Sequence, residues 1–150
     1  MSLIGSIFHK FSERAGQKHT LAEWQTVLQA SGAVVNGRFQ ASTDTDKHHN
    51  TGRHIIGIER WGQSRLRVFL GEKLVMDEYD EYRPAADLDM DALRKIFSET
   101  RQETIALTAN IQEAGISPAQ TVAHNDMGNL TVRGWLAYLN GHASRESGRL

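Results

Sequence analysis

Apolar residues recur every three or four positions through most of this 150-residue chain, and prolines hardly interrupt the pattern. Apolar residues at this spacing share one face of an α-helix. Proline removes a backbone donor and breaks the interior of a helix. The only two prolines, Pro84 and Pro118, both lie in the second half of the chain. The sequence therefore predicts long amphipathic helices, and the one ambiguous strand run is residues 73–76.

One short and four long segments show this helical pattern. The short N-terminal segment is expected to end near Gly16 and to lie over the core, with an apolar face made of Ile4, Ile7, Phe8 and Phe11. The long helices are expected at residues 20–39, 51–70, 89–114 and 131–150. We therefore predict one domain over residues 1–150. Its fold class is all-α, an antiparallel-type four-helix bundle with a short extra N-terminal helix.

Capping residues support the predicted helix ends. Thr20 followed by Glu23 has the form of a capping box, in which each side chain accepts a hydrogen bond from the backbone of the other residue. Asp89 and Thr131 are further N-caps, and glycines that favour helix ends follow at Gly71 and Gly115. Each tryptophan lies on the apolar face of its helix, so we expect burial of Trp24, Trp61 and Trp135.

Three polar stretches are expected to connect the helices. Residues 41–50, which include two adjacent histidines, are expected to form a solvated loop. Residues 77–84 are acidic and aromatic, and a solvated crossover loop is the first interpretation, with a lid or a partner surface as the second. Residues 116–129 are expected to form a loop that carries His124.

Composition excludes several kinds of function. Cysteine is absent, which rules out disulfides, thiolate metal ligands and cysteine nucleophiles. The formal net charge is -1, and the arginines of one helix scatter around it without forming a basic stripe, which argues against nucleic-acid binding. No apolar run reaches the roughly 18 residues of a membrane span, and the N-terminus does not resemble a signal peptide. We expect a cytoplasmic protein with no nucleic-acid or membrane partner.

Three ionisable residues lie on or beside apolar helix faces, namely His54, His142 and Glu146. Burial of such groups is unfavourable unless they are paired or bind an ion. His142 and Glu146 are four residues apart and project from successive turns, while His54 can supply a second imidazole from another helix. Two imidazoles and a carboxylate suit Zn²⁺, Ni²⁺ or Fe²⁺. The alternative is that His142 and Glu146 are solvated and that His54 is a core histidine bonded to a carbonyl.

Two stretches resemble the DinB-like (damage-inducible) superfamily of four-helix bundles. Residues 51–61, TGRHIIGIERW, look like the second-helix signature, a histidine followed by an apolar pair and then Glu-Arg. Residues 124–142, HNDMGNLTVRGWLAYLNGH, are similar to the loop and fourth-helix signature that precedes a metal-binding histidine. The likeness in helix order and spacing covers about residues 20–150, while the specific motifs cover only these two stretches.

The resemblance implies a metal site. Family members hold a divalent ion with one histidine from the second helix and two from a His-x-x-x-His pair on the fourth. His54 and His142 match the first two ligands, whereas Glu146 stands where the family has its third histidine. A carboxylate in that place gives a site of two histidines and one carboxylate, with a weaker preference for soft metals. The same departure is compatible with a loss of metal binding.

The resemblance also implies an activity. Characterised relatives include thiol-dependent transferases and isomerases, so it implies a metal-dependent transferase, isomerase or hydrolase acting on a small molecule such as a low-molecular-weight thiol. His124 and Tyr138 are candidates for a general base or a substrate contact, or else a loop histidine bonded to the backbone and an interfacial tyrosine. Family members often form dimers, which implies a homodimer. The alternative function is a non-catalytic, stress-associated helical bundle with a degenerate metal site.

Overall fold

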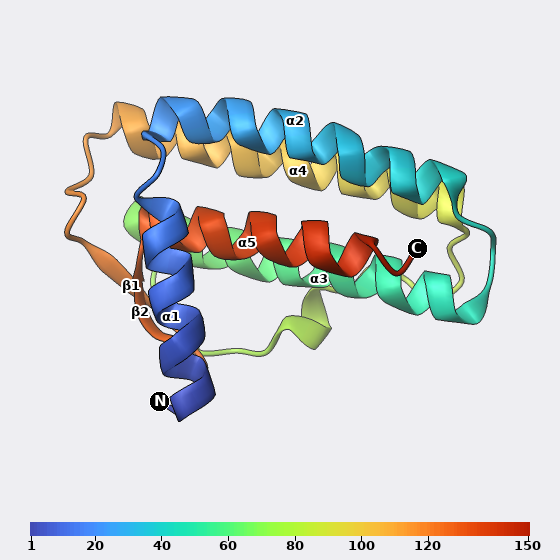
Figure 1. The fold of residues 1–150 in the computed structure, drawn as a ribbon, viewed down its shortest axis with the longest axis horizontal. Helices are drawn as coiled ribbons and strands as arrows, with labels where there is room; N and C mark the ends of the chain where they lie inside the picture. The colour runs from blue at the N-terminus through green and yellow to red at the C-terminus, as the bar shows by residue number, and fades with distance from the viewer.

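The computed structural model describes all 150 residues, and most of them are helical (Figure 1). The helices are α1 (Leu3–Gly16), α2 (Leu21–Ala41), α3 (Asp46–Phe69), α4 (Met90–Glu113) and α5 (Val132–Ser147), with a single 3-10 turn η1 (Tyr79–Tyr82) between α3 and α4. Two short strands, β1 (Thr121–His124) and β2 (Gly128–Thr131), pair as an antiparallel hairpin before α5. The predicted helical class is therefore confirmed, with a small hairpin added to it.

The four long helices pack side by side, and α2 and α3 each contact both α4 and α5. Figure 1 shows α2 and α5 running in one direction and α3 and α4 in the other. The packing is therefore not purely antiparallel, because the long connection after α3 returns to the end of the molecule at which α3 began. The backbone amide of Met90, at the start of α4, accordingly donates to Asp44 in the connection between α2 and α3 at 2.7 Å. No helix combines the length and the apolar character that a membrane crossing requires.

The predicted caps are present. Thr20 and Glu23 form the capping box, with the Glu23 amide donating to Thr20 Oγ1 at 3.1 Å and the Thr20 amide donating to Glu23 Oε1 at 3.2 Å. Asp89 and Thr131 cap α4 and α5 through side-chain oxygens. Gly71 and Gly115 follow α3 and α4 with φ of 101° and 65°, a region that glycine enters without strain.

Two helix boundaries differ from the predicted positions, and the ambiguous strand run is absent. The loop expected at 41–50 ends at Thr45, because Thr45 Oγ1 accepts from the His48 amide at 3.2 Å and α3 begins five residues earlier than the predicted position 51. Residues 73–76 form no strand. The C-terminal helix ends at Ser147 rather than at residue 150. Each difference concerns a helix end or a short segment, where several local signals compete.

The stretch expected to be a loop at 116–129 contains the hairpin instead. Val122 pairs with Leu130 in the antiparallel register, and both side chains point into the core. The indole of Trp135 donates to the Val122 carbonyl at 3.1 Å and ties the hairpin to α5. Gly128 begins β2 with a φ of 72°. The turn at residues 125–127 places the side chain of His124 against α5.

The predicted burial of the tryptophans is confirmed. Trp24, Trp61 and Trp135 are 4%, 3% and 0% exposed, respectively. Each indole N–H also has a backbone partner, since Trp24 donates to the Gly16 carbonyl at 3.0 Å and Trp61 donates to the Asp77 carbonyl at 3.1 Å. These bonds satisfy the polar edge of each ring, so that its apolar surface can be buried without a penalty.

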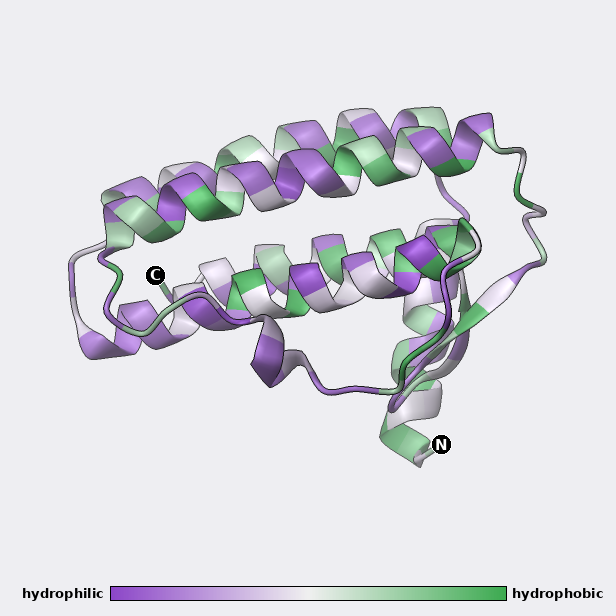
Figure 2. Cartoon of the chain, turned by 180° about the vertical axis from the view of Figure 1, so that it is seen from behind, coloured by the Kyte–Doolittle hydropathy of each residue, from purple (hydrophilic) through white to green (hydrophobic).

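The expectation that α1 covers the core with its apolar face is wrong. The helix packs on α5 and β2 through its small residues Gly5, Ser12 and Gly16, which are buried. A Cβ on Gly16 would lie 2.5 Å from the carbonyl carbon of Arg133, so only glycine permits this approach. The large apolar side chains instead face outward, and Leu3 is 80% and Phe11 68% exposed. Figure 2 shows hydrophobic segments in α1 towards its N-terminal end, which projects away from the other helices.

Candidate functional site

Two of the three predicted metal ligands meet between α3 and α5. The Nε2 atoms of His54 and His142 lie 3.0 Å apart, and the two ring centroids are 4.9 Å apart. At this distance one ring donates its proton and the other accepts it, so at least one ring is neutral. The expectation that His54 is bonded to a carbonyl is wrong, because its partner is an imidazole.

The backbone around this pair allows close helix packing. A Cβ on Gly62 would lie 2.7 Å from Leu139 Cδ1, so this glycine allows α3 to approach α5. Tyr79 of η1 packs edge-on against His54, with ring centroids 5.2 Å apart. Gly57 leaves room for the residue after η1, because a Cβ there would lie 2.9 Å from Arg83 Cγ. The histidine pair therefore lies between two long helices and is covered on one side by η1.

Burial keeps both imidazoles in the form that binds metals. It lowers the pKa of His142 to about 3, and the neighbouring His54 and Arg145 add to this shift. Burial also lowers the pKa of His54, while the negative charge of Glu146 acts in the opposite direction. Both rings are consequently neutral at pH 7, and a neutral imidazole offers a lone pair to a metal ion.

Glu146 is close to the pair but turned towards arginines. Its carboxylate lies 3.3 Å from Arg149 Nη1 and 3.8 Å from Arg145 Nε. No group of three histidine, aspartate or glutamate side chains in the structure is arranged to hold a metal ion. The side chain of Glu146 is nevertheless only 13% exposed, and its charge acts on His54. The structure thus brings two of the expected ligands together, with the third one helical turn away.

The separation of the two nitrogens suits a shared ion. Two imidazole nitrogens at about 2.0–2.1 Å from a tetrahedral Zn²⁺ lie about 3.3 Å apart. The distance of 3.0 Å between His54 and His142 is close to that value. The donor set of two neutral imidazoles therefore fits a divalent ion, and a carboxylate on the next turn is available to complete it.

His124 and Tyr138 lie beside the pair without touching its hydrogen bond. His124 Nδ1 accepts from the amides of Asp126 at 3.0 Å and Met127 at 3.3 Å, as expected for a loop histidine bonded to the backbone. Burial lowers the pKa of His124 to about 4. Tyr138 packs edge-on against His124 at 4.7 Å between centroids and lies 6.2 Å from the ring of His142. Burial raises the pKa of Tyr138, so its phenol stays protonated.

A groove of about 790 Å³ runs between α1 and α5 beside these residues. Apolar side chains of α1, among them Ile4, Phe8 and Phe11, form one wall. The opposite wall comes from α5 and the hairpin, and includes the three ring residues His124, Tyr138 and His142. Sequence analysis did not find this groove, since it arises from the outward orientation of the apolar face of α1.

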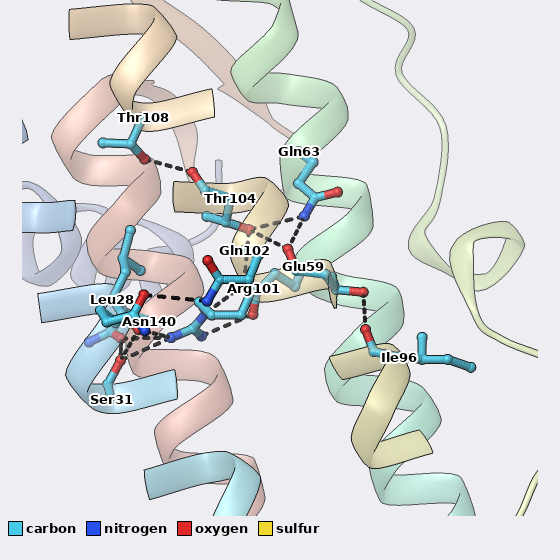
Figure 3. A network of polar contacts seen from close by, with 12 residues as sticks. Leu28, Ser31, Glu59, Gln63, Ile96, Arg101, Gln102, Thr104, Thr108 and Asn140 are labelled. Carbon is cyan, nitrogen blue, oxygen red and sulfur yellow. Dashed lines mark hydrogen bonds and ion pairs between the residues drawn. The ribbon is translucent and has the colours of Figure 1, made fainter. Parts of the chain in front are cut away.

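Sequence analysis also missed a buried ion pair at the centre of the four long helices (Figure 3). Arg101 of α4 donates to Glu59 of α3 through two bonds, from Nε to Oε1 at 2.6 Å and from Nη2 to Oε2 at 3.0 Å. Thr104 donates to the same carboxylate at 2.9 Å, and Gln63 donates to Thr104 at 3.0 Å. Both charged side chains are at most 3% exposed.

The rest of the guanidinium reaches the remaining two long helices. Arg101 Nη1 donates to the Leu28 carbonyl at 3.2 Å and to Ser31 Oγ at 2.9 Å, both on α2, and lies 3.5 Å from Asn140 Oδ1 on α5 (Figure 3). Gly32 makes room for this side chain, because a Cβ there would lie 2.8 Å from Arg101 Cγ. One side chain therefore links all four helices, and we assign it a structural role.

The connection at residues 77–84 is packed on α3, while its acidic residues at positions 78, 80 and 81 remain exposed, so it is only partly the solvated loop that was expected. The Asp77 carbonyl accepts from Asn125 at 2.9 Å, and the Asp77 carboxylate accepts from the Tyr82 hydroxyl at 2.6 Å. Arg65, which is 1% exposed, also donates to the Asp77 carbonyl at 3.3 Å. The connection therefore holds η1 and Tyr79 over His54.

Comparisons with family models, with curated proteins and with solved structures found no match to this chain. Function is therefore inferred from the residues of the chain and from their positions.

Proposed function

We propose that this chain is a DinB-like four-helix bundle that binds a divalent metal ion, Zn²⁺, Ni²⁺ or Fe²⁺, through His54 and His142, with Glu146 as the third ligand. The observation that carries this proposal is the 3.0 Å separation of two neutral Nε2 atoms in a half-enclosed position between helices. A lone buried histidine more often finds a carbonyl, whereas two facing imidazole nitrogens suit one shared cation.

The activity that we propose is that of a metal-dependent thiol transferase, isomerase or hydrolase. A divalent ion at this place would lower the pKa of a water molecule or a thiol that it binds. The groove beside His142 offers space for a small-molecule substrate. Tyr138 and His124 line that groove and are the candidates for contacts to the substrate. A homodimer belongs to the same proposal through the DinB-like resemblance, and a cytoplasmic location belongs to it as the location expected from the sequence.

A non-catalytic, stress-associated bundle with a degenerate metal site is the second candidate. The observation that favours it is the pairing of the Glu146 carboxylate with Arg149 and Arg145. This pairing turns the carboxylate towards the arginines instead of the histidines. In that case the bond between His54 and His142 is a structural contact between α3 and α5. The two candidates differ in whether the purified chain retains metal.

Metal stoichiometry separates the two candidates. Purified protein is stripped with a chelator, dialysed against Zn²⁺, Ni²⁺ or Fe²⁺, and its bound metal is measured by elemental analysis. We expect about one ion per chain, lost in His54→Ala and in His142→Ala, and kept or bound more tightly in Glu146→His. His48→Ala, at the surface of the same helix as His54, is the matched control and should keep the ion. Metal-free wild-type protein would favour the non-catalytic bundle.

A further inference from the structure

The outward side of α1 carries large apolar side chains. Leu3 is 80%, Ile7 47% and Phe11 68% exposed, and their spacing of four residues places them in one stripe along the helix. A surface helix normally turns such a stripe to the core. We call these three residues the outward stripe of α1. Leu3 and Ile7 do not line the groove between α1 and α5, so the outward stripe is a surface of its own.

The outward stripe points away from the contact that holds α1 in place. Gly5, Ser12 and Gly16 are buried on the other side of the helix, where α1 packs on α5 and β2. The N-terminal part of α1 also extends beyond the other helices (Figure 1). A flat surface can therefore reach the outward stripe while α1 keeps its place on α5.

Unpaired cations follow one edge of the outward stripe. Lys10 lies three positions after Ile7, and Arg14 lies three positions after Phe11, so each cation is next to an apolar side chain on the helix surface. Lys18 follows directly after the helix. All three cations are exposed, and none of them takes part in an ion pair.

No acidic side chain of α1 balances these cations. Glu13 is the one acidic residue of the helix, and its carboxylate accepts from the Thr131 amide at 2.7 Å and from the Thr131 hydroxyl at 2.9 Å. It therefore belongs to the contact with α5. The backbone of Asp126 adjoins Gly5, which is also on the buried side. The outward side of α1 thus combines apolar side chains with positive charge, and this combination is complementary to an anionic surface.

We propose that α1 binds the surface of an anionic phospholipid bilayer, with the outward stripe below the headgroups and with Lys10 and Arg14 at the phosphates. Helices with an apolar face and neighbouring cations lie in the plane of the interface in this way, with the apolar face about 5–10 Å deep. The expectation of no membrane partner rested on the lack of a spanning segment, and a helix that lies along the surface needs none.

A bilayer suits this face better than a second copy of the chain does. In a symmetric dimer the same patch forms both sides of the contact. Lys10 and Arg14 would then meet a patch that carries cations and no free carboxylate. Anionic lipid headgroups supply the negative charge that this patch lacks.

Sedimentation with vesicles tests the proposal. The full chain is mixed with vesicles of phosphatidylcholine or with vesicles of an equimolar mixture of phosphatidylcholine and phosphatidylglycerol, and the bound fraction gives the partition coefficient. We expect at least about tenfold tighter binding to the anionic vesicles, because each of the cations is attracted to the negative surface. High salt should remove most of this difference by screening.

A first pair of variants tests the apolar contact. The double substitution Leu3→Ser/Phe11→Ser removes two side chains that the bilayer would bury, so binding to the anionic vesicles should weaken at least about tenfold. Val34→Ser is the matched control, because Val34 is an apolar residue of α2 with 56% exposure. The control should bind within about twofold of the wild type.

A second pair of variants tests the charges. The double substitution Lys10→Gln/Arg14→Gln should weaken binding to the anionic vesicles at least about tenfold and leave binding to phosphatidylcholine unchanged. Lys47→Gln is the matched control, since Lys47 is an exposed cation of α3 that also forms no ion pair. All substituted side chains are exposed, so circular dichroism should show unchanged helicity in every variant.

Three results would overturn the proposal. One is the absence of binding to the anionic vesicles, and another is equal binding of the wild type and of Leu3→Ser/Phe11→Ser. The third is a two-chain mass in solution that falls to one chain in Leu3→Ser/Phe11→Ser, together with no vesicle binding by the wild type. That outcome would show that a second copy of the chain covers the outward stripe.

Discussion

The Nε2 atoms of His54 and His142 lie 3.0 Å apart, although 88 positions separate the two residues in the chain. They meet because α3 and α5 pack closely, and Gly62 on α3 leaves space for Leu139 on α5. Each imidazole is thereby the polar partner of the other between the two helices. The geometry of this pair depends on the spacing of the two helices.

Gly62→Ala should weaken the contact between α3 and α5. The new Cβ would lie 2.7 Å from Leu139 Cδ1 and 2.9 Å from Leu139 Cγ, so either the side chain or the helix must move. Overpacking of this kind costs about 1–3 kcal/mol of stability. Urea unfolding followed by circular dichroism measures the change in the free energy of unfolding.

Gly37→Ala is the control for this substitution. Nothing lies within 4 Å of its Cβ position, and alanine in a helix interior is favoured over glycine by roughly 0.5–1 kcal/mol. We expect this variant to be slightly more stable than the wild type. If Gly62→Ala were stabilised to the same extent, close packing at Gly62 would not limit the approach of the helices.

Arg101→Met should be strongly destabilising. The substitution leaves the Glu59 carboxylate, which is 2% exposed, without its bidentate partner. Removal of one member of a buried ion pair costs about 3–5 kcal/mol. Thermal and urea unfolding of the variant provide the measurement.

Arg67→Met is the matched control on the surface. Arg67 pairs with Glu103 at 3.1 Å, but the two side chains are 33% and 48% exposed. Exposed pairs of this kind contribute about 0–1 kcal/mol. A loss in Arg101→Met no larger than that in Arg67→Met would show that the central network does not hold the four helices together.

Stability should fall as the pH drops below about 6.5, the ordinary pKa of histidine in an unfolded chain. Burial lowers the pKa of His124 to about 4 in the folded protein, so the unfolded state binds more protons between these two values. Each such histidine contributes a slope of up to about 1.4 kcal/mol per pH unit. Unfolding free energies of the wild type and of His124→Asn, measured between pH 7 and pH 5, should show a shallower slope in the variant. Parallel slopes would mean that His124 does not stay neutral in the folded state.

The long helices were predictable because their signals are local. Capping residues such as Thr20, Asp89 and Thr131 lie next to the helices that they start, and apolar periodicity extends over several turns. Burial of the tryptophans followed from the same periodicity. The start of α3 was missed because Thr45 caps it and the polar residues after Thr45 resemble a loop.

The orientation of α1 and the central ion pair were not predictable in this way. Periodicity shows that α1 has an apolar face but not which face contacts the rest of the protein, and here small residues such as Gly5 and Gly16 decide the contact. Glu59 and Arg101 meet from different helices, so the pattern of one helix does not reveal the pair. Thr104 is a polar residue in the apolar stripe of α4, and it donates to the Glu59 carboxylate. Its place in that stripe was the one sequence feature that could have indicated buried polar contacts on α4.

The histidine pair was predicted because His54 and His142 lie on apolar helix faces and because of the DinB-like resemblance. The four-residue spacing of His142 and Glu146 placed both on one side of α5, but it did not show that nearby arginines hold the carboxylate. The position of the Glu146 side chain depends on all the charged groups within its reach. The spacing of His142 and Glu146 alone does not reveal those groups.

The most direct test of the metal proposal is a zinc titration followed by side-chain ¹⁵N NMR of the histidines. Zinc bound between the two rings should shift the Nε2 signals of His54 and His142 together and saturate at one ion per chain. The Nε2 signals of the surface histidines His48 and His49 should stay unchanged at that ratio. Unchanged Nε2 signals of His54 and His142 at saturating zinc, or shifts confined to the surface histidines, would contradict a metal site at this pair.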